Sequence, residues 1–391
     1  MLLFTGKGGV GKTSVAAATA LHTSALGYNT VLISTDPAHS LSDCFDISLG
    51  PELRKVESNL FALEIDVQHE LEANWSEVQN YLTTLFSSQG LDEVVAEEMA
   101  VLPASEEIAS LLHICRYDQE KKFDVLVVDS APTGEALRLL SFPDVMRWYM
   151  EKIFGLERKL IKVVRPVAKM VISAPLPSDR VMRSIEDLYQ RINRVKDILE
   201  NPAKTSIRLV STAEKMVIAE TQRAFSYLNL FGYPVDAVII NRLLPDEVKA
   251  PYFDGWKKLQ SEYVHLTHES FYPLKILQSR LFEREIVGKD AIAAMAKEIY
   301  GEIDPTESFV KERPIKIFKE SGKYVVSIKL PFTSKEDVDV YSKGEELIVR
   351  IKNWKRVFVL PKALTGLRPE RAEYSDNILE VRMGIGNGQR R

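Results

Sequence analysis

The sequence predicts an α/β fold, in which a doubly wound and mostly parallel sheet is followed by a smaller all-β sandwich. Over residues 1–310, short apolar runs alternate with long amphipathic stretches, and most of the apolar runs lack a period of two. Such runs are typical of parallel strands that helices cover on both faces. After residue 301, short β-rich runs follow one another with turns but no helix between them. A length of 391 residues, of which 45% are apolar, leaves room for two or three globular domains.

Six apolar runs are expected to form the sheet, with amphipathic helices between them. Helical periodicity is clearest at 12–26 and 213–231. The stretches 67–117 and 143–200 do not fit simple crossovers, so we expect helical insertions there that form a subdomain of the 1–301 domain. The predicted strands are 2–5, 30–34, 60–65, 125–129, 207–211 and 235–241.

The C-terminal part begins after a polar linker at 302–313. We expect a β-sandwich over 314–383 and a short tail at 384–391. From Pro314 onward the chain has 16 lysines and arginines against 10 aspartates and glutamates, whereas the upstream part has 35 against 45. This imbalance favours docking of a basic module on an acidic body. The predicted strands are 315–319, 324–330, 337–341, 347–351, 355–360 and 378–383.

The composition excludes several classes of protein. Only two cysteines are present, Cys44 and Cys115, which excludes a disulfide scaffold and a four-thiolate zinc site within one chain. No apolar stretch is long enough to span a membrane, and no dense basic tract suggests nucleic-acid binding. We therefore expect a soluble protein of a reducing compartment that is not an integral membrane protein and has no nucleic-acid partner.

The first predicted strand ends in a glycine-rich loop that leads directly into a predicted helix. In this context the pattern G-x-x-x-x-G-K-[ST] predicts a nucleotide phosphate loop, whose backbone N–H groups surround the β-phosphate. Lys12 is expected to reach the β- and γ-phosphates, and the Thr13 hydroxyl is expected to bind Mg²⁺ directly. The loop consists of Gly6, Lys7, Gly8, Gly9, Val10, Gly11, Lys12, Thr13 and Ser14.

Lys7 directly follows the first glycine of the loop, in the form K-G-G-x-G-K-T. This form resembles the deviant Walker A loop of a group of dimeric ATPases. The resemblance implies a catalytic role for Lys7, which would cross the dimer interface to the nucleotide of the partner subunit. The group includes partitioning and division-site ATPases, the nitrogenase iron protein, and the arsenite-pump and tail-anchored-protein-targeting ATPases.

Asp36 begins a segment that follows the second predicted strand and reads D-P-A-H-S-L. A carboxylate placed after a phosphate loop can orient the water that attacks the γ-phosphorus. The segment resembles switch I of the arsenite-pump and tail-anchored-targeting ATPases, which narrows the resemblance to this family. Asp36 is therefore the expected catalytic carboxylate, and it is also expected to hold Mg²⁺ through water.

Asp129 ends another apolar strand, and the segment that it begins reads D-S-A-P-T-G and resembles switch II of the same family. The resemblance implies that Asp129 holds Mg²⁺ through water and that Gly134 senses the γ-phosphate, with Pro132 in the same switch. Two residues depart from the family pattern. Ser130 replaces a threonine, and Glu135 stands where relatives often carry histidine.

Asn241 ends the last predicted strand of the sheet and resembles the asparagine with which the family reads adenine. Its amide offers one donor and one acceptor to the adenine edge. By the same resemblance, Pro273 occupies a position beside the base. Glu214 and Glu220 match a further family pattern, in which Glu214 pairs with Lys7 across the dimer.

The C-terminal module separately resembles the α-crystallin fold of small heat-shock proteins. The matching segments are 330–338, 347–349, 356–361 and 372–379. The tail lacks an I-x-I anchor, so large heat-shock-type oligomers are not expected. The ATPase resemblance covers residues 1 to about 301, and together the two identify the chain as a member of the branch with an α-crystallin-like domain.

These resemblances imply a homodimeric, Mg²⁺-dependent ATPase of the cytoplasm or plastid stroma. Its ATP cycle would open and close a site for a hydrophobic client segment, for example a tail-anchored or other membrane-protein helix. The amphipathic stretches 137–150 and 153–171 are the candidate groove, because flexible methionines suit varied apolar clients. The methionines in and near these stretches are Met146, Met150, Met170 and Met182.

Two alternatives to the client-gating ATPase stay open. One is a nucleotide-gated scaffold or partitioning-type switch whose partner is a protein or a membrane surface. The other is an arsenite-pump ATPase subunit, which is disfavoured because trivalent arsenic takes three soft thiolates and the chain has two cysteines. Zinc is not expected, because the region 244–252 lacks the C-x-x-C pair of the targeting factors.

Overall fold

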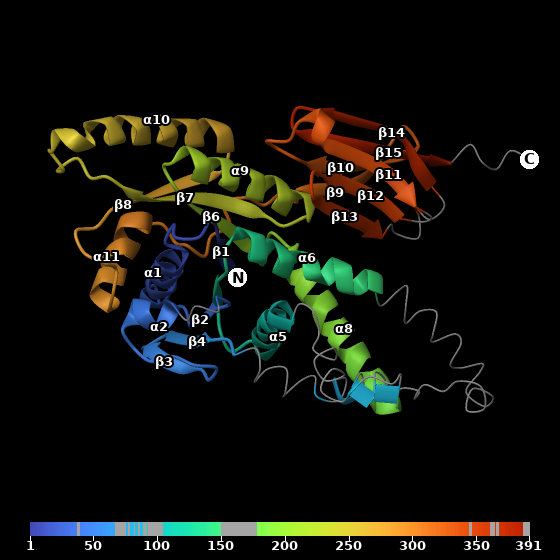
Figure 1. Cartoon of the computed structure of the whole chain (residues 1–391), viewed down its shortest axis with the longest axis horizontal. Helices are drawn as coiled ribbons and strands as arrows, with labels where there is room; N and C mark the ends of the chain where they lie inside the picture. Colours follow the sequence, from blue (N-terminus) through green and yellow to red (C-terminus); the bar gives the residue numbers. More distant parts are fainter. Residues whose placement is uncertain are drawn as a thin grey trace, which may run out of the picture.

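The computed structural model describes residues 1–36, 40–66, 105–149, 178–343, 346–359 and 367–385, together with a few isolated positions. Within these ranges an eight-stranded sheet forms the centre of the N-terminal part, in the order β3-β4-β2-β5-β1-β6-β7-β8 (Figure 1). All neighbouring strands in it are parallel except the pair β3 and β4. The predicted doubly wound, mostly parallel sheet is confirmed.

Six strands of the sheet were predicted from their apolar runs and two were not. The edge strands β3 (Arg54–Glu57) and β8 (Lys275–Arg280) alternate exposed polar with buried residues, so neither forms a continuous apolar run. The predicted strands are β1 (Leu2–Thr5), β2 (Thr30–Ser34), β4 (Leu60–Glu64), β5 (Val125–Asp129), β6 (Ser206–Thr212) and β7 (Val235–Leu243).

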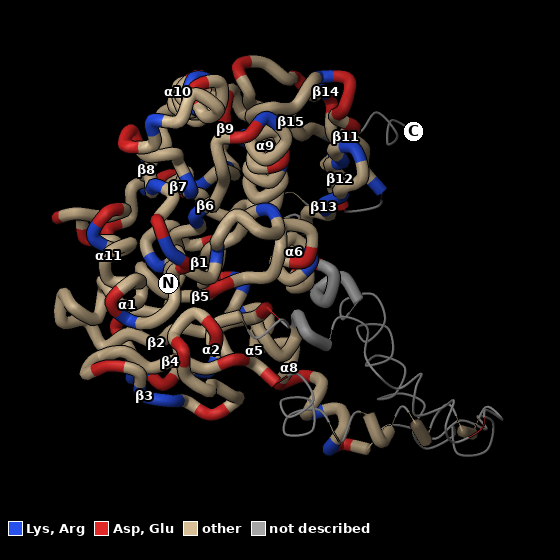
Figure 2. Tube along the Cα trace, turned by 60° about the vertical axis from the view of Figure 1, so that its left-hand side comes forward, with Lys and Arg blue, Asp and Glu red and all other residues tan. Residues whose placement is uncertain are grey.

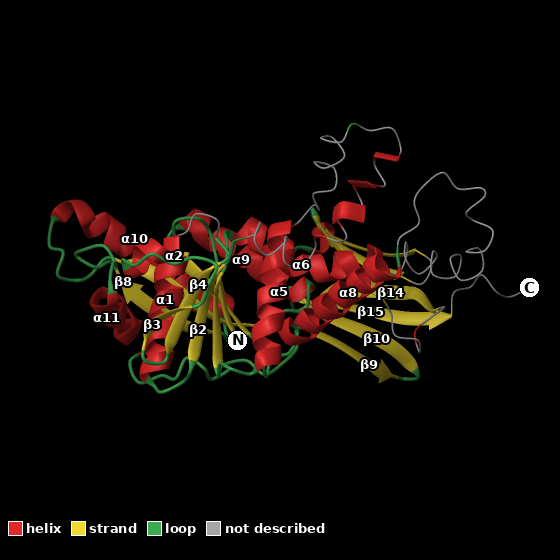
Figure 3. Ribbon diagram, turned by 90° about the horizontal axis from the view of Figure 1, so that it is seen from below, coloured by secondary structure: helices red, strands yellow, loops and turns green. Residues whose placement is uncertain are grey.

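Helices cover both faces of the sheet (Figure 3). One face packs against α1 (Lys12–Ala25), α2 (Ser40–Phe45) and α11 (Lys289–Tyr300), whose apolar residues form one core cluster with the strands. The opposite face packs against α5 (Ser105–Glu120), α6 (Thr133–Tyr149), α8 (Asp179–Leu199) and α9 (Lys215–Leu230) in a second cluster. A short 3₁₀ turn, η2 (Pro251–Phe253), and α10 (Asp254–Phe271) connect β7 to β8. None of the helices in the described ranges is both long and apolar enough to span a membrane.

The predicted helical insertions are described only in part. Helices α5 and α8 lie within them, whereas 67–75, 93–104 and 150–177, and with them Met150, Met170 and the stretch 153–171, lie outside the described residues. The predicted start of the second insertion at residue 143 falls inside α6, which runs through Pro143 without ending, and the bounds of the insertion stay a prediction. Three residues before this proline, the Leu140 carbonyl oxygen accepts a hydrogen bond from the buried Tyr233 hydroxyl. This bond stabilises the helix near Pro143.

The C-terminal part is the predicted β-sandwich. One antiparallel sheet has the order β14-β15-β10-β9 and the other the order β11-β12-β13, with an apolar core between them. Strand β14 was not predicted, because its sequence is rich in charged residues and mostly exposed. The strands are β9 (Ile315–Glu320), β10 (Lys323–Lys329), β11 (Val338–Lys343), β12 (Glu346–Ile351), β13 (Trp354–Val359), β14 (Leu367–Ser375) and β15 (Ile378–Ile385), and a 3₁₀ turn, η3 (Lys335–Asp337), precedes β11. Of the predicted tail, residues 386–391 lie outside the described part.

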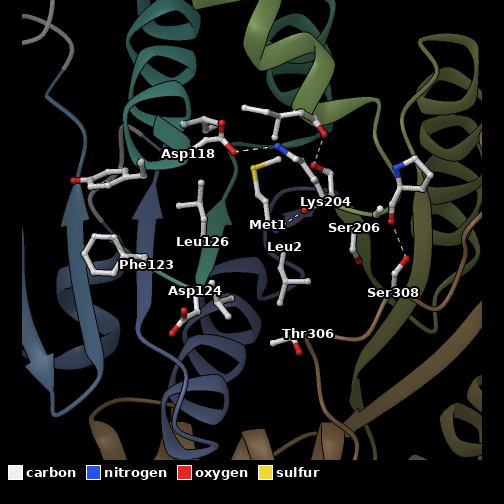
Figure 4. A pocket seen from close by; sticks show the side chains of 17 residues that line it. Met1, Leu2, Asp118, Phe123, Asp124, Leu126, Lys204, Ser206, Thr306 and Ser308 are labelled. Atoms are coloured by element: carbon white, nitrogen blue, oxygen red, sulfur yellow. Dashed lines mark hydrogen bonds and ion pairs between the residues drawn. The ribbon is translucent and has the colours of Figure 1, made fainter. Parts of the chain in front are cut away.

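The linker between the two parts packs on the body. The buried Arg208 guanidinium donates to the Pro305 carbonyl oxygen at 2.5 Å and lies over the Phe309 ring, and Ser308 donates to the Pro202 carbonyl oxygen at 3.1 Å. Thr306 and Ser308 also line a cavity of about 350 Å³ at the amino ends of β1, β5 and β6 (Figure 4). These contacts fix the direction in which the chain enters the sandwich.

The sandwich docks on the body mainly through aromatic side chains. The Trp354 ring packs on Tyr227 and Phe231 of the α9 region, at centroid distances of 5.5 and 6.0 Å, and Phe332 packs on Phe225 and Phe271. Basic and acidic residues are interspersed on both parts (Figure 2). The docking of the module therefore includes aromatic contacts that the difference in net charge did not predict.

Candidate functional site

The phosphate loop connects β1 to α1 at the carboxyl edge of the sheet. Gly11 caps α1 with a φ of 91°, and a Cβ at this position would lie 2.4 Å from Asn241 Nδ2. At Gly6 a Cβ would lie 2.1 Å from the Val210 carbonyl oxygen. The loop passes so close to β6 and β7 that both positions require glycine.

Residues at the end of β7 brace this loop. Asn241 Nδ2 donates to the Val10 carbonyl oxygen at 2.9 Å, and Arg242 Nη1 donates to the Gly9 carbonyl oxygen at 2.7 Å. The Asn241 side-chain oxygen accepts from the Arg242 backbone N–H. The structure thus brings Asn241 to the phosphate loop. One hydrogen and one oxygen lone pair of the Asn241 amide are not used in these bonds, and they are the groups that a contact with adenine requires. The adenine contact itself remains a prediction.

Lys12 and Asp129 are two buried titratable residues of the site. Lys12 is only 6% exposed, and burial lowers the pKa of its ammonium although Asp129 and Asp36 act in the opposite direction. Burial likewise raises the pKa of Asp129 to about 7. Its Oδ2 accepts from Ser34 at 3.3 Å, whereas its buried Oδ1 has no hydrogen-bond partner among the described residues.

The arrangement around Asp129 fits Mg²⁺. A buried carboxylate oxygen without a partner, together with threonine and serine hydroxyls, provides the hard oxygen donors that this cation prefers. Thr13 Oγ1 lies 3.1 Å from Ser40 Oγ, next to the start of switch I. No cluster of three or more His, Cys, Asp or Glu side chains in the described ranges could hold a metal ion alone. Phosphate oxygens and water would have to complete the shell.

Switch I is held to the sheet by a residue that the sequence did not single out. Asp36 follows β2 and lines the site cavity, whereas Pro37, Ala38 and His39 of the predicted motif lie outside the described residues. At the start of α2, the N–H groups of Leu41 and Ser42 donate to Glu64 Oε1 at 3.1 and 2.9 Å. Glu64 is the last residue of β4. A carboxylate at the carboxyl end of a predicted strand is the feature by which the sequence could have identified it.

Switch II leaves β5 and becomes helix α6. The Ser130 N–H donates to the Phe4 carbonyl oxygen at 3.1 Å, and the Thr133 N–H donates to the Gly6 carbonyl oxygen at 3.2 Å. Pro132 and Gly134 therefore lie beside the first glycine of the phosphate loop. Glu135 is close enough to Lys12 for its charge to act on the lysine ammonium. The departure from the family pattern at Glu135 thus lies next to the phosphate site.

The cavity beside the phosphate loop has a volume of about 710 Å³. Its far wall is the loop that follows β8, which the sequence did not single out and which includes Leu281, Phe282 and Val287. Pro273 precedes β8 and so lies toward the amino edge of the parallel sheet, away from this cavity. The expected contact between Pro273 and the base is not supported by this position. The cavity is lined by Gly9, Gly11, Lys12, Thr13, Ser14, Asp36, Ser40, Asp43, Cys44, Asn241, Arg242, Arg280, Leu281, Phe282, Glu283, Arg284, Glu285, Ile286, Val287 and Met295.

The remaining candidate residues lie around this centre. Lys7 is half-buried, and its carbonyl oxygen accepts from Lys12 Nζ at 3.4 Å. Glu214 precedes α9 and accepts from the Thr212 hydroxyl at 2.9 Å. Both cysteines are buried and free, and burial raises the pKa of Cys44, which lines the cavity, to about 12. A pairing of Lys7 with Glu214 of a second subunit stays a prediction.

The raised pKa of Asp129 makes the stability of the protein depend on pH. Because the folded-state pKa of about 7 lies above the ordinary 3.8, the folded protein keeps a proton that the unfolded chain releases. Relative to Asp129→Asn, the wild type should therefore lose stability as the pH rises from about 4 to about 7. The loss should reach about 4 kcal/mol above pH 7, at 1.36 kcal/mol for each pKa unit.

Urea unfolding at pH 4, 6 and 8, in EDTA and without nucleotide, measures this difference. The matched control is Asp246→Asn, which removes an exposed carboxylate that does not line the site cavity. Identical pH profiles of the wild type and Asp129→Asn would contradict the prediction.

Comparison with known protein families agrees with this geometry. The family described as "Anion-transporting ATPase" matches residues 1–301, and the family described as "HSP20-like domain found in ArsA" matches residues 321–383. The "Putative arsenical pump-driving ATPase" of Prosthecochloris vibrioformis is 42% identical over 97% of this chain and 95% of the relative, and the "Putative arsenical pump-driving ATPase 1" of Aquifex aeolicus is 43% identical over 97% and 98%. The "ATPase GET3" of Rhodotorula glutinis is 28% identical over 73% of this chain and 84% of its own length. The chain therefore belongs to the anion-transporting ATPase family, and it carries the HSP20-like domain found in ArsA.

Proposed function

We propose that this ATPase works as a homodimer in which ATP binding and hydrolysis gate the capture of a hydrophobic protein segment. The observation that carries the proposal is the continuity of switch II with α6: one helix begins beside the phosphate loop and packs with α5 and α8 in the helical layer. A change at the γ-phosphate would thereby move the helices next to the candidate client region. The proposed compartment is the cytoplasm, or the plastid stroma of a plant.

The site residues take the following roles in this proposal. Lys12 and the loop N–H groups bind the phosphates, and Asp36 orients the attacking water. Thr13 would bind Mg²⁺ directly, while Asp36 and Asp129 would hold its water ligands. When bound, the cation neutralises charge that develops on the phosphates. Lys7 would reach the nucleotide of the partner subunit.

An arsenite-pump subunit is the second candidate, because three relatives of 42–43% identity are named for that function. The two cysteines argue against it. Cys44 lies in α2 and Cys115 in α5, in separate clusters of the core, and burial raises the pKa of both thiols. Neither thiol is poised to ionise and bind a soft ion. The nucleotide-gated scaffold is the third candidate.

Titration of ATPase activity with two effectors separates the candidates. A peptide of about 20 apolar residues, the length of a membrane-spanning helix, should change the steady-state ATPase rate at least about threefold and bind with different affinities in ATP and ADP. Sodium arsenite should leave the rate unchanged. Stimulation by arsenite alone would favour the pump subunit, and a rate insensitive to both would favour the scaffold.

The proposed dimer should survive removal of zinc. Residues 244–252 contain no cysteine to form an intersubunit zinc site, and His265 and His268 are already engaged with Glu269 and Gln278. Sedimentation velocity with and without a strong zinc chelator, in buffer free of ATP, checks this. Dissociation on chelation would contradict the expectation and would point to these two histidines.

A further inference from the structure

Helix α6 joins the nucleotide site to the HSP20-like domain. It begins at Thr133, whose N–H donates to the Gly6 carbonyl oxygen, and it reaches Asp144 eleven residues later. At 1.5 Å per residue, this separation is about 16 Å along the helix. Between the two ends, Leu137 and Leu140 lie in the core. The later part of α6 lies close to the C-terminal sandwich (Figure 1).

At that end, Arg356 of strand β13 enters a buried network of charges. Arg356 Nε lies 3.5 Å from Asp144 Oδ2, and Arg356 Nη2 donates to Glu200 Oε1 at 2.9 Å. Lys196 of α8 forms ion pairs with both acids, and Arg356 Nη1 donates to the Leu230 carbonyl oxygen at 2.8 Å. The side chains of Arg356, Lys196 and Asp144 are only 7%, 8% and 11% exposed.

One guanidinium thus ties three helices to the sandwich: α6 through Asp144, α8 through Glu200 just beyond its end, and α9 through its last residue, Leu230. Buried charges lose much more than exposed ones when a partner moves away, because water does not replace the partner. A shift of α6 would separate Asp144 from Arg356 unless the sandwich followed. The docked domain therefore restrains the helix whose first turn is switch II.

We propose that Arg356 is a positioning residue for ATP hydrolysis, which acts from the HSP20-like domain through Asp144 and α6 on switch II. The proposal rests on the ATPase activity of the family and is independent of client binding. It predicts that loss of Arg356 slows the hydrolysis step, because this step requires switch II to be correctly placed at the γ-phosphate. It predicts little effect on the phosphate-loop contacts that ATP and ADP share.

Arg356→Met keeps much of the side-chain volume and removes the charge. Its single-turnover rate constant for hydrolysis, measured with the enzyme in saturating excess over ATP, should fall about tenfold, while the Kd for ADP should change less than about twofold. A single-turnover rate constant does not depend on the fraction of folded protein, so partial misfolding would not mimic the result. Arg356→Lys, which keeps one charged contact, should restore the rate to within about threefold of wild type.

Asp144→Asn tests the same contact from α6 and guards against a sandwich that fails to fold. It should lower the rate constant by a similar factor, and the double variant should lose less than the two single losses combined, since both changes remove the contact between Arg356 and Asp144. The matched control is Arg350→Met, which breaks the exposed pair with Asp339 on the neighbouring strand and should leave the rate unchanged. Wild-type rates in Arg356→Met and Asp144→Asn would overturn the proposal, as would a parallel loss of ADP affinity.

Discussion

Asp36→Asn should keep ATP binding and lose hydrolysis by about 10²-fold or more, as expected when a positioning base is removed. Asp36 follows β2 and lines the cavity with Lys12 and Thr13. The amide keeps the shape of the side chain but lacks the charge and the acceptor capacity that orient water. The phosphate loop, with its own N–H groups and Lys12, remains intact and should bind the nucleotide as before.

Nucleotide affinity and single-turnover hydrolysis of Asp36→Asn should be measured on the same preparation. Asp43→Asn is the matched control, because Asp43 lines the same cavity from α2 and has no assigned part in the reaction. Its hydrolysis rate should stay within about threefold of wild type, the range of an indirect electrostatic effect. Wild-type turnover in Asp36→Asn would refute the catalytic assignment.

Truncation after Gly301 should leave ATP binding intact and sharply lower stability and solubility. All of the described residues that line the nucleotide cavity precede residue 301, whereas Trp354 and Phe332 cover the aromatic face of α9 and α10. Trp354 is partly buried between the two parts, and loss of a packed Trp side chain costs up to about 3–5 kcal/mol. At about 2–4 °C per kcal/mol, the value for domains of 150–250 residues, this contact alone corresponds to up to about 6–20 °C in Tm, and the truncation, which also removes Phe332, should lower Tm by more than Trp354→Ala does.

Thermal unfolding, light scattering and ATP affinity of the truncated chain give the three readouts. The full-length variant Trp354→Ala removes only one ring and should show a smaller fall in Tm with unchanged ATP affinity. Capture of a fluorescent hydrophobic peptide should also change on truncation. A well-folded truncated chain without ATP binding would place part of the nucleotide site in the C-terminal domain, against the present assignment.

The site residues that could be predicted from the sequence are those whose role follows from the residues next to them in the chain. The phosphate loop, Asp36 and Asp129 each follow an apolar strand directly, and parallel strands bring their carboxyl ends to one edge. Glu64 had the same signal, but its function depends on the N–H groups of α2, which only the packed structure places beside it.

Pro273 illustrates why the positions of other residues in the fold could not be predicted from the sequence. The chain from Lys275 to Arg280 lacks a continuous apolar run, so it was not predicted as a strand. Without that strand, nothing in the sequence decides whether a residue before it lies at the amino or the carboxyl edge of the sheet. The loop after β8 lines the cavity instead, and its mixture of apolar and charged residues gives no local pattern for a nucleotide contact. The aromatic contacts of Trp354 likewise arise from docking.

The order of these contacts along the chain has a consequence for synthesis on the ribosome. Arg356 closes onto the Leu230 carbonyl oxygen across a separation of 126 residues, and Trp354 covers the rings of Tyr227 and Phe231 over a similar span. At about 5–20 residues per second, translation of that interval takes about 6–25 s. During this time the aromatic face of α9 has left the ribosome but has no cover. We expect nascent chains that end between residues 260 and 350 to be the species most readily bound by general chaperones.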